Sequence, residues 1–289
     1  MWPASLSLAL ERRSHRTVLA RCRHRGPLRV QRALYPEDTC HIYLLHPPGG
    51  VVGGDSLDVE VAAAAGARGL ITTPAAGKLY RSDRRWATLT QRCRVADQAS
   101  VEWFPHENIV FDNAWARVTT EVELAPEATF IGWDITCLGR PASGERFAHG
   151  ACIQRMSVRR GGALLWMEHN RYEGGAARME ARWGLGGYSV CATLVAIAAQ
   201  SVIGADAAAP ATAVAPNVTA WLSALRDELG RAPGPEDAQA GVTALGPVIV
   251  CRYLGREAEH ARAVLIRLWA RLRPLIVGRA AVPPRIWAT

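Results

Sequence analysis

Lysine is almost absent from this sequence, because Lys78 is the only lysine among 34 basic residues. So strong a preference for arginine, in a chain rich in alanine and glycine, reflects genome composition better than it indicates nucleic-acid binding. The basic residues are not interleaved with aromatic residues in a nucleic-acid-binding motif. The net charge of +8 therefore favours attraction to an acidic protein partner over binding to DNA or RNA.

Long apolar runs and a secretion signal are also missing. No run reaches the roughly 18 to 20 residues that a membrane span needs. At the N-terminus, Arg12, Arg13 and Arg16 follow only a weak apolar stretch, which is not the pattern of a signal peptide. With 289 residues, 49% of them hydrophobic, the chain is expected to form a soluble cytoplasmic protein with a sizeable core and no membrane partner.

Paired cysteine motifs do not occur. The seven cysteines are widely spaced and contain no Cys-x-x-Cys pair, so the sequence predicts neither a disulfide framework nor a zinc knuckle. Most of them are expected to be small buried residues. Cys40 and His41 are neighbours on an expected strand and should point to opposite faces, which predicts a buried cysteine beside a surface histidine.

Nucleotide-binding and catalytic motifs are missing as well. The Gly77-Lys78 pair is followed by Leu79 and lacks the earlier glycine of a phosphate-binding loop. There is no Gly-x-Ser-x-Gly elbow and no His-Glu-x-x-His motif, and the eight histidines are scattered. The sequence therefore argues against nucleotide hydrolysis by this chain and against a closed zinc or nickel cage.

The most constrained segment is residues 46–55, which holds four glycines, two prolines and a final carboxylate, Asp55. Such a segment cannot form a helix or an ordinary strand, because glycine allows positive φ and proline lacks a donor. It does not match Gly-x-Gly-x-x-Gly, and no helix is expected after it. The segment is predicted to be a rigid loop that positions Asp55, either as a structural corner or as part of a site.

Short β-like runs separated by turn signals fill the first 200 residues, and no helical period persists there. A hairpin turn is predicted at 159–162, where two arginines precede two glycines. The pattern predicts a mainly β protein with stacked sheets, a sandwich or a β-solenoid-like arrangement. The expected strands are 56–62, 68–73, 87–95, 100–104, 116–124, 129–136, 151–158 and 163–170.

Two α-helices are expected in the C-terminal third. Apolar residues at helical spacing predict one helix at 216–229 and a second at 257–272, which Pro274 should end. A β pair is expected between them at 241–254, and the alanine- and proline-rich stretch 205–216 is expected to be a surface loop. No domain boundary or strict internal repeat is evident, so residues 1–289 are predicted to form one domain.

Two carboxylates stand inside apolar runs. Asp134 lies in FIGWDI and Glu168 lies in LLWME. Burying a charged group is costly unless it is paired or hydrated. Two interpretations stay open: each acid faces solvent through simple strand alternation, or both acids line a wet internal cavity.

Several segments together resemble urease accessory proteins of the UreD family, called UreH in some bacteria. They follow in order along nearly the whole chain, although His106 stands where the family pattern commonly has glutamine. The segments are GPLRVQR (26–32), YPEDTCHIYLLHPPGGVVGGD (35–55), ITTP (71–74), KLYR (78–81), EWFPHE (102–107), WD (133–134), CLGRP (137–141), LW (268–269), LRP (272–274) and PRIW (284–287).

The resemblance implies a non-enzymatic factor for urease maturation. Such a protein binds apo-urease and recruits UreF, which in turn recruits the GTPase UreG, so that nickel is inserted into urease. The implied fold is a mainly β stacked structure with two helices. An internal tunnel for Ni²⁺ in transit, with no stably bound cofactor, is also implied.

The positions that match the tunnel are four acids and one glycine: Asp38, Asp55, Asp134, Glu168 and Gly77. Nickel binds tightly to thiolate and imidazole ligands, whereas spaced carboxylates would hold it weakly enough to leave again. Two other functions stay possible from the residues alone. One is a β-rich hydrolase that uses Asp55 or Asp134 as a general acid or base, and the other is an arginine-rich nucleic-acid-binding protein.

Overall fold

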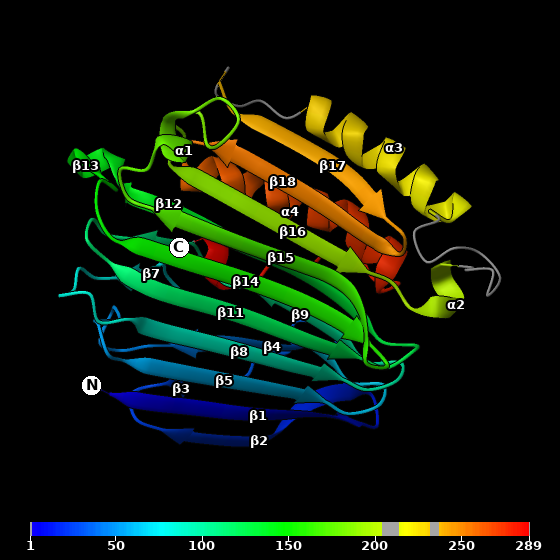
Figure 1. The fold of residues 1–289 in the computed structure, drawn as a ribbon. Coiled ribbons are helices and arrows are strands. Elements are labelled where there is room, and N and C mark those ends of the chain that lie inside the picture. The colour runs from blue at the N-terminus through cyan, green and yellow to red at the C-terminus, as the bar shows by residue number, and fades with distance from the viewer. Residues whose placement is uncertain (1, 204–213, 232–236, 289) are drawn as a thin grey trace.

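Two β-sheets lie face to face, and helices cover the outer face of one of them (Figure 1). The computed structural model describes residues 2–203, 214–231 and 237–288. One sheet has seven strands in the order β15-β14-β11-β8-β5-β1-β2. These strands are β1 (Pro3–Arg13), β2 (Arg16–Arg25), β5 (Ser56–Ala63), β8 (Ala87–Val95), β11 (Trp115–Leu124), β14 (Ala151–Arg160) and β15 (Ala163–Glu173).

The second sheet has eleven strands, and its main path runs β17-β18-β16-β12-β9-β6-β4-β3; β10 and β13 also pair with β12, and β7 pairs with β10. We refer to the two as the seven-stranded sheet and the eleven-stranded sheet. The strands of the second are β3 (Arg29–Val30), β4 (Cys40–Leu45), β6 (Arg68–Thr72), β7 (Gly77–Leu79), β9 (Ser100–Phe104), β10 (Asn108–Val110), β12 (Thr129–Arg140), β13 (Glu145–Arg146), β16 (Val190–Ile197), β17 (Gln239–Leu245) and β18 (Val248–Gly255).

The chain winds between the sheets as a short solenoid. It passes from β5 to β6, from β8 to β9 and from β11 to β12, each time crossing from the seven-stranded to the eleven-stranded sheet. Within each sheet the successive turns of the winding pair in parallel, so that Ser56, Thr88 and Arg117 are stacked in register. The predicted mainly β, solenoid-like architecture is therefore confirmed.

The eight predicted strands are all present, and β12 and β15 extend beyond their predicted ends. The predicted hairpin joins β14 to β15, where Gly161 and Gly162 both have positive φ. The β pair predicted at 241–254 is formed by β17 and β18. Residues 3–13 were not predicted as a strand, yet they form β1, which pairs with β5 and β2.

Helices occupy the C-terminal part, as predicted. They include α3 (Pro216–Gly230) and α4 (Ala258–Ile276), while α1 (Ala177–Glu180) and α2 (Gln200–Ile203) are single turns, too short to produce a sequence period. Two 3₁₀ turns, η1 (Pro141–Ser143) and η2 (Arg285–Ala288), were also not predicted. The predicted loop at 205–216 lies mostly outside the described residues. No helix among the described residues is both long and apolar enough to cross a membrane.

The predicted end of the second helix before Pro274 is wrong. Helix α4 continues through Pro274 to Ile276, because buried Leu272 and Ile276 and the fully buried Arg273 attach its last turn to the sheet. A proline there removes only one backbone donor from the final turn, and the tertiary contacts outweigh that loss. Figure 1 shows α4 behind β16 and β18.

Strand β12 separates two hydrophobic cores. Phe130 and Leu138 point into the core between the sheets, whereas Ile131 and Trp133 point into the core beneath the helices. Trp133 stacks on Phe104 with ring centroids 4.1 Å apart. Because strand side chains alternate between faces, every polar residue on the inner face of β12 is enclosed between the sheets.

Both faces of β4 are covered as well, which corrects one prediction. Cys40 and His41 do point to opposite faces, but His41 is only 1% exposed, so it is not a surface residue. The face that carries His41 is covered by the C-terminal part of the chain, and Arg273 lies close enough to act on its charge. Burial lowers the pKa of His41 to about 4, so that it is neutral at pH 7.

Arg273 is the polar anchor between α4 and the eleven-stranded sheet. Its Nε atom lies 3.0 Å from both carboxylate oxygens of Glu102, and neither side chain is exposed by more than 1%. Trp269 donates its indole N–H to Glu102 at 2.6 Å. The guanidinium also pairs with Glu37 and donates to Thr39 at 3.3 Å.

Replacing Arg273 with leucine should destabilise the protein by about 3–5 kcal/mol, because Glu102 would stay buried without its cation. Urea unfolding would measure the change. The matched control is Arg271→Leu on the same helix, whose ion pair with Glu228 at 2.9 Å is exposed on the arginine side. That control should cost no more than about 1 kcal/mol, and equal losses in the two variants would contradict the prediction.

Candidate functional site

Polar side chains form a continuous row in the space between the two sheets. The row starts where β7, β10 and β12 lie side by side, with Gly77, Asn108 and Thr136 as register partners. It continues along the inner face of β12 to Asp134, because Thr136 donates its hydroxyl to Asp134 at 3.3 Å. We call this row, together with the cavity at each end of it, the inter-sheet path.

A partly enclosed cavity of about 460 Å³ lies at the first end of the path. Gly77, His46 and Asn108 supply part of its wall, and the glycine-rich segment 46–51 supplies another part. A Cβ atom at position 77 would lie 2.7 Å from the amide oxygen of Asn108. Glycine at this position therefore keeps the space in front of Asn108 open.

Backbone hydrogen bonds and close packing hold the loop at 46–55 against the next turn of the winding. The backbone N–H of Val51 donates to the carbonyl of Lys78 at 2.8 Å, and the N–H of Tyr80 donates to the carbonyl of Val51 at 2.9 Å. The loop is therefore paired with β7 through its backbone. A Cβ atom on Gly50 would lie 2.2 Å from the ring of Tyr80, and one on Gly53 would lie 2.4 Å from Ser82. These glycines permit close packing against the next turn of the winding.

In this conformation Asp55 binds the backbone at the start of the N-terminal strand, β1. Its carboxylate accepts the backbone N–H of Trp2 at 2.9 Å and that of Val52 at 3.3 Å. The side chain is buried, and its negative charge partly opposes the lowering of the pKa of His46 by burial. Asp55 is therefore next to His46, one of the residues that line the partly enclosed cavity.

Asp134 is buried in the middle of the inter-sheet path at 6% exposure. Burial raises its pKa to about 6, while hydrogen bonds from Gln154 and Thr136 act in the opposite direction. The negative charge of Glu168 adds to the rise. The interpretation in which strand alternation turns Asp134 to solvent is therefore wrong.

Glu168 lies at the other end of the path and is also buried, at 9% exposure. It accepts a hydrogen bond from the Thr193 hydroxyl at 3.3 Å and pairs with Arg252 at 3.1 Å. Thr193 is the register partner of Asp134 on β16, so the residue that binds Glu168 lies directly beside Asp134 in the sheet. A cavity of about 740 Å³, lined by Glu168, Thr193, Arg252 and Tyr172, opens at this end.

Asp38 has a different environment. Its Oδ2 atom lies within ion-pair distance of three guanidinium groups, at 3.0 Å from Arg12, 2.8 Å from Arg68 and 2.9 Å from Arg279. Although burial acts to raise its pKa, these arginines bring the pKa of Asp38 below its usual value. In this conformation the carboxylate joins β1, β6 and the C-terminal segment.

The four predicted acids therefore occupy three places. Asp134 and Glu168 are together inside the path. Asp55 binds Trp2 at the start of β1 and Asp38 binds Arg12 near its end. At about 3.3 Å per residue, these two ends of β1 are roughly 30 Å apart.

Two thiols lie close to the paired acids. The pKa of Cys152, which lies near Asp134, and that of Cys191, which Tyr172 hydrogen-bonds, are both raised by burial to about 12. At neutral pH they are uncharged thiols, which are weak metal ligands compared with thiolates. The oxygen atoms around them come from carboxylate, amide and hydroxyl groups, which suit weak coordination of a divalent cation.

Sequence reasoning missed Gln154, Thr193 and Arg252 in this site. A signal existed for Gln154, because it shares the buried phase of β14 with Cys152 and Met156. Arg252 gave no such signal, since an arginine on a strand normally faces solvent. Among the described residues, no group of three or more His, Cys, Asp or Glu side chains is placed to hold a metal ion.

Asp134→Asn should change how stability depends on pH. Because the pKa of Asp134 is about 6 in the folded chain and near 3.8 otherwise, its contribution to stability is present below about pH 4 and lost as pH rises to 6. The asparagine of the variant does not ionise, so the variant does not lose this stability as pH rises. At about 1.4 kcal/mol per pKa unit, its stability relative to wild type should rise by roughly 3 kcal/mol between pH 3 and pH 7.

Urea unfolding of both proteins at several pH values would measure this difference directly. Parallel stability curves for wild type and Asp134→Asn across that range would contradict the raised pKa.

Comparison with known proteins assigns the chain to a family. Residues 3–288 match the family model described as UreD urease accessory protein. The chain is 46% identical over 291 residues to the urease accessory protein UreD of Azoarcus sp. (strain BH72), covering 100% of this chain and 94% of that protein. It is 41% identical over 290 residues to the protein of that name from Dechloromonas aromatica (strain RCB), covering 100% and 95%. The chain belongs to the UreD urease accessory protein family.

Proposed function

We propose that this chain is a urease maturation factor that acts as a non-catalytic scaffold in the cytoplasm. It binds apo-urease and recruits UreF, and through UreF the GTPase UreG. Membership of the UreD family supports this proposal, and relatives that match the whole chain are named as urease accessory proteins. The net charge of +8 favours assembly with partners whose surfaces are acidic.

We further propose that Ni²⁺ passes through the protein along the inter-sheet path as cargo. The observation that carries this proposal is the Asp134–Glu168 pair: both acids are buried, they lie close enough for the charge of Glu168 to act on Asp134, and Glu168 lines the cavity at one end of the path. Two carboxylates in a buried space offset the desolvation of a dication that moves between them. No resident metal or cofactor is part of the proposal.

The chemistry of the path favours release over trapping. Nickel is high in the affinity order of divalent metals for nitrogen and sulfur ligands, so a site rich in thiolate or imidazole would hold it. In the path, burial keeps Cys152 and Cys191 as neutral thiols, with pKa values of about 12. Carboxylate and hydroxyl oxygens bind weakly enough for the ion to move on, as conduction requires.

The remaining predicted positions have different relations to this path. Gly77 lines the partly enclosed cavity and keeps Asn108 accessible. Asp55 lies beside His46 at the same cavity, and its part in nickel transit stays a prediction. Asp38 could take part only after at least one of its three arginines moved away, since all three neutralise its carboxylate in this conformation.

Glu168→Gln and Asp134→Asn should each lower the activation of urease at limiting nickel several-fold, while complex assembly is retained. Each change keeps the side-chain shape and removes the negative charge that the cation needs. The matched control is Glu60→Gln on β5, a side chain that points away from the inter-sheet core. Urease activity and bound nickel would be measured after activation with each variant.

Normal activation by both path variants at limiting nickel would contradict the transit role. The scaffold role is tested separately by co-purification of the tagged chain with urease subunits and UreF. Failure of the wild-type chain to retain either partner would contradict it, whatever the nickel result.

A further inference from the structure

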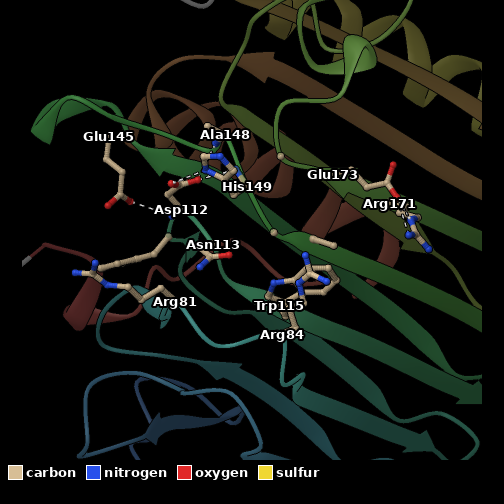
Figure 2. A pocket seen from close by; sticks show the side chains of 14 residues that line it. Arg81, Arg84, Asp112, Asn113, Trp115, Glu145, Ala148, His149, Arg171 and Glu173 are labelled. Carbon is tan, nitrogen blue, oxygen red and sulfur yellow. Dashed lines mark hydrogen bonds and ion pairs between the residues drawn. The ribbon is translucent and has the colours of Figure 1, made fainter.

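A solvent-open pocket of about 750 Å³ lies at the end of the molecule where β8, β11 and β14 begin (Figure 2). We call it the end-face pocket. Phe111 and Trp115 form its aromatic part, and Arg81, Arg84 and Arg171 bring guanidinium groups to it. None of its lining residues lines either cavity of the inter-sheet path, so it is a separate feature.

The turns that precede β8, β11 and β14 form the backbone around this pocket and hydrogen-bond to one another. Ser82 donates to the carbonyl of Asn113 at 3.0 Å, and Asn113 donates to that of His149 at 3.1 Å. Arg84 and Asn113 both have left-handed backbones, with φ of 67° and 62°. Asparagine adopts this conformation readily, whereas a bulky arginine seldom does. The chain therefore keeps a large cation at a position where the backbone favours a smaller residue.

Two carboxylates of the pocket already have donors. Asp112 accepts the backbone N–H groups of Ala148 at 2.8 Å and His149 at 2.7 Å, and its second oxygen lies 3.2 Å from the His149 ring (Figure 2). Glu145 pairs with Arg140 at 2.7 Å, which lowers its pKa. Neither acid is available to neutralise the other arginines of the pocket.

The third carboxylate is occupied in the same way. Glu173 pairs with Arg171 at 2.6 Å and with Arg178 at 2.5 Å, and these contacts lower its pKa. All three acids are therefore ionised at neutral pH and matched within the chain.

Two guanidinium groups of the pocket have no carboxylate partner within the described residues. Among the described residues, Arg81 and Arg84 form no ion pair, and their side chains form no hydrogen bond. Both residues are exposed and line the end-face pocket. Trp115, which also lines it, has a buried indole N–H without an acceptor in the described part of the chain. The pocket thus offers two guanidinium groups and one indole N–H whose hydrogen-bonding capacity is not used within the described residues.

We propose that the end-face pocket docks an acidic segment of a partner protein through two neighbouring carboxylates. A guanidinium binds a carboxylate through two parallel hydrogen bonds and stacks on aromatic rings, which fits Arg81 and Arg84 in a pocket that Phe111 and Trp115 also line. Binding of a nucleic-acid strand in place of a peptide is one of the outcomes that the test distinguishes. The proposal concerns a surface outside the inter-sheet path and does not depend on nickel transit.

The test compares the wild-type chain with the double variant Arg81→Glu/Arg84→Glu. Isothermal titration at low ionic strength would measure binding of a six-glutamate peptide. We expect the variant to bind at least about tenfold more weakly, because it replaces attraction with repulsion at the contact. The control, Arg94→Glu/Arg155→Glu, makes the same change in net charge at two exposed arginines outside the pocket and should bind as wild type does.

Three outcomes would overturn the proposal. They are absence of peptide binding by the wild-type chain, an equal loss in the control variant, and tighter binding of a six-residue thymidine oligonucleotide than of the peptide. Co-purification with urease subunits and UreF supplies a second measurement, in which the pocket variant should lose a partner that the control variant keeps. If the wild-type chain retains neither partner, the scaffold proposal fails, whereas the peptide result still decides the pocket.

Arg84→Asn separates a binding role from a structural one. Asparagine tolerates the left-handed backbone, so the variant should unfold at a temperature no lower than wild type. It should nevertheless lose peptide affinity, since one of the two free guanidinium groups is gone. A lower unfolding temperature with unchanged affinity would show that Arg84 serves the fold instead.

Discussion

The ion pair between Arg273 and Glu102 determines which parts of this protein are inside. It attaches α4 to the outer face of β9, so that the eleven-stranded sheet is covered by helices on one side and by the seven-stranded sheet on the other. Two buried charges are costly to desolvate, and here each has further partners, namely Trp269 for the carboxylate and Glu37 for the guanidinium. With both faces covered, any polar residue on β12 must find its partners within the protein.

That constraint explains the inter-sheet path. Asp134 and Thr136 lie on the inner face of a strand that is buried on both sides, so they bind each other and take their other polar neighbours from the facing sheet and from adjacent strands. Glu168 differs, because β15 is the last strand of its sheet and its neighbour Arg252 is 61% exposed. The path therefore runs from the space between the sheets to an edge where Arg252 already pairs with the final carboxylate.

Local patterns were sufficient for most of the fold but not for the pairing of charges. Alternation and turn residues predicted the strands, and helical spacing predicted α3 and α4, because each depends on residues close in the sequence. Asp134 and Glu168 were recognised as unusual because each is an acid in an apolar run. The arginines on Asp38, in contrast, come from positions 12, 68 and 279, and no local pattern connects them. The persistence of α4 past Pro274 has the same origin, since the contacts that hold its last turn are distant in sequence.

The winding that creates the path also creates the end-face pocket. Each turn of the winding re-enters the seven-stranded sheet at the same end, and the re-entry turns stack there with left-handed residues at Gly54, Arg84, Asn113 and Gly150. A glycine at such a position follows from backbone geometry alone. An arginine there does not, and its guanidinium has no partner among the described residues. The interior thus matches acids to polar neighbours within the chain, whereas the end face presents two exposed arginines that form no ion pair among the described residues.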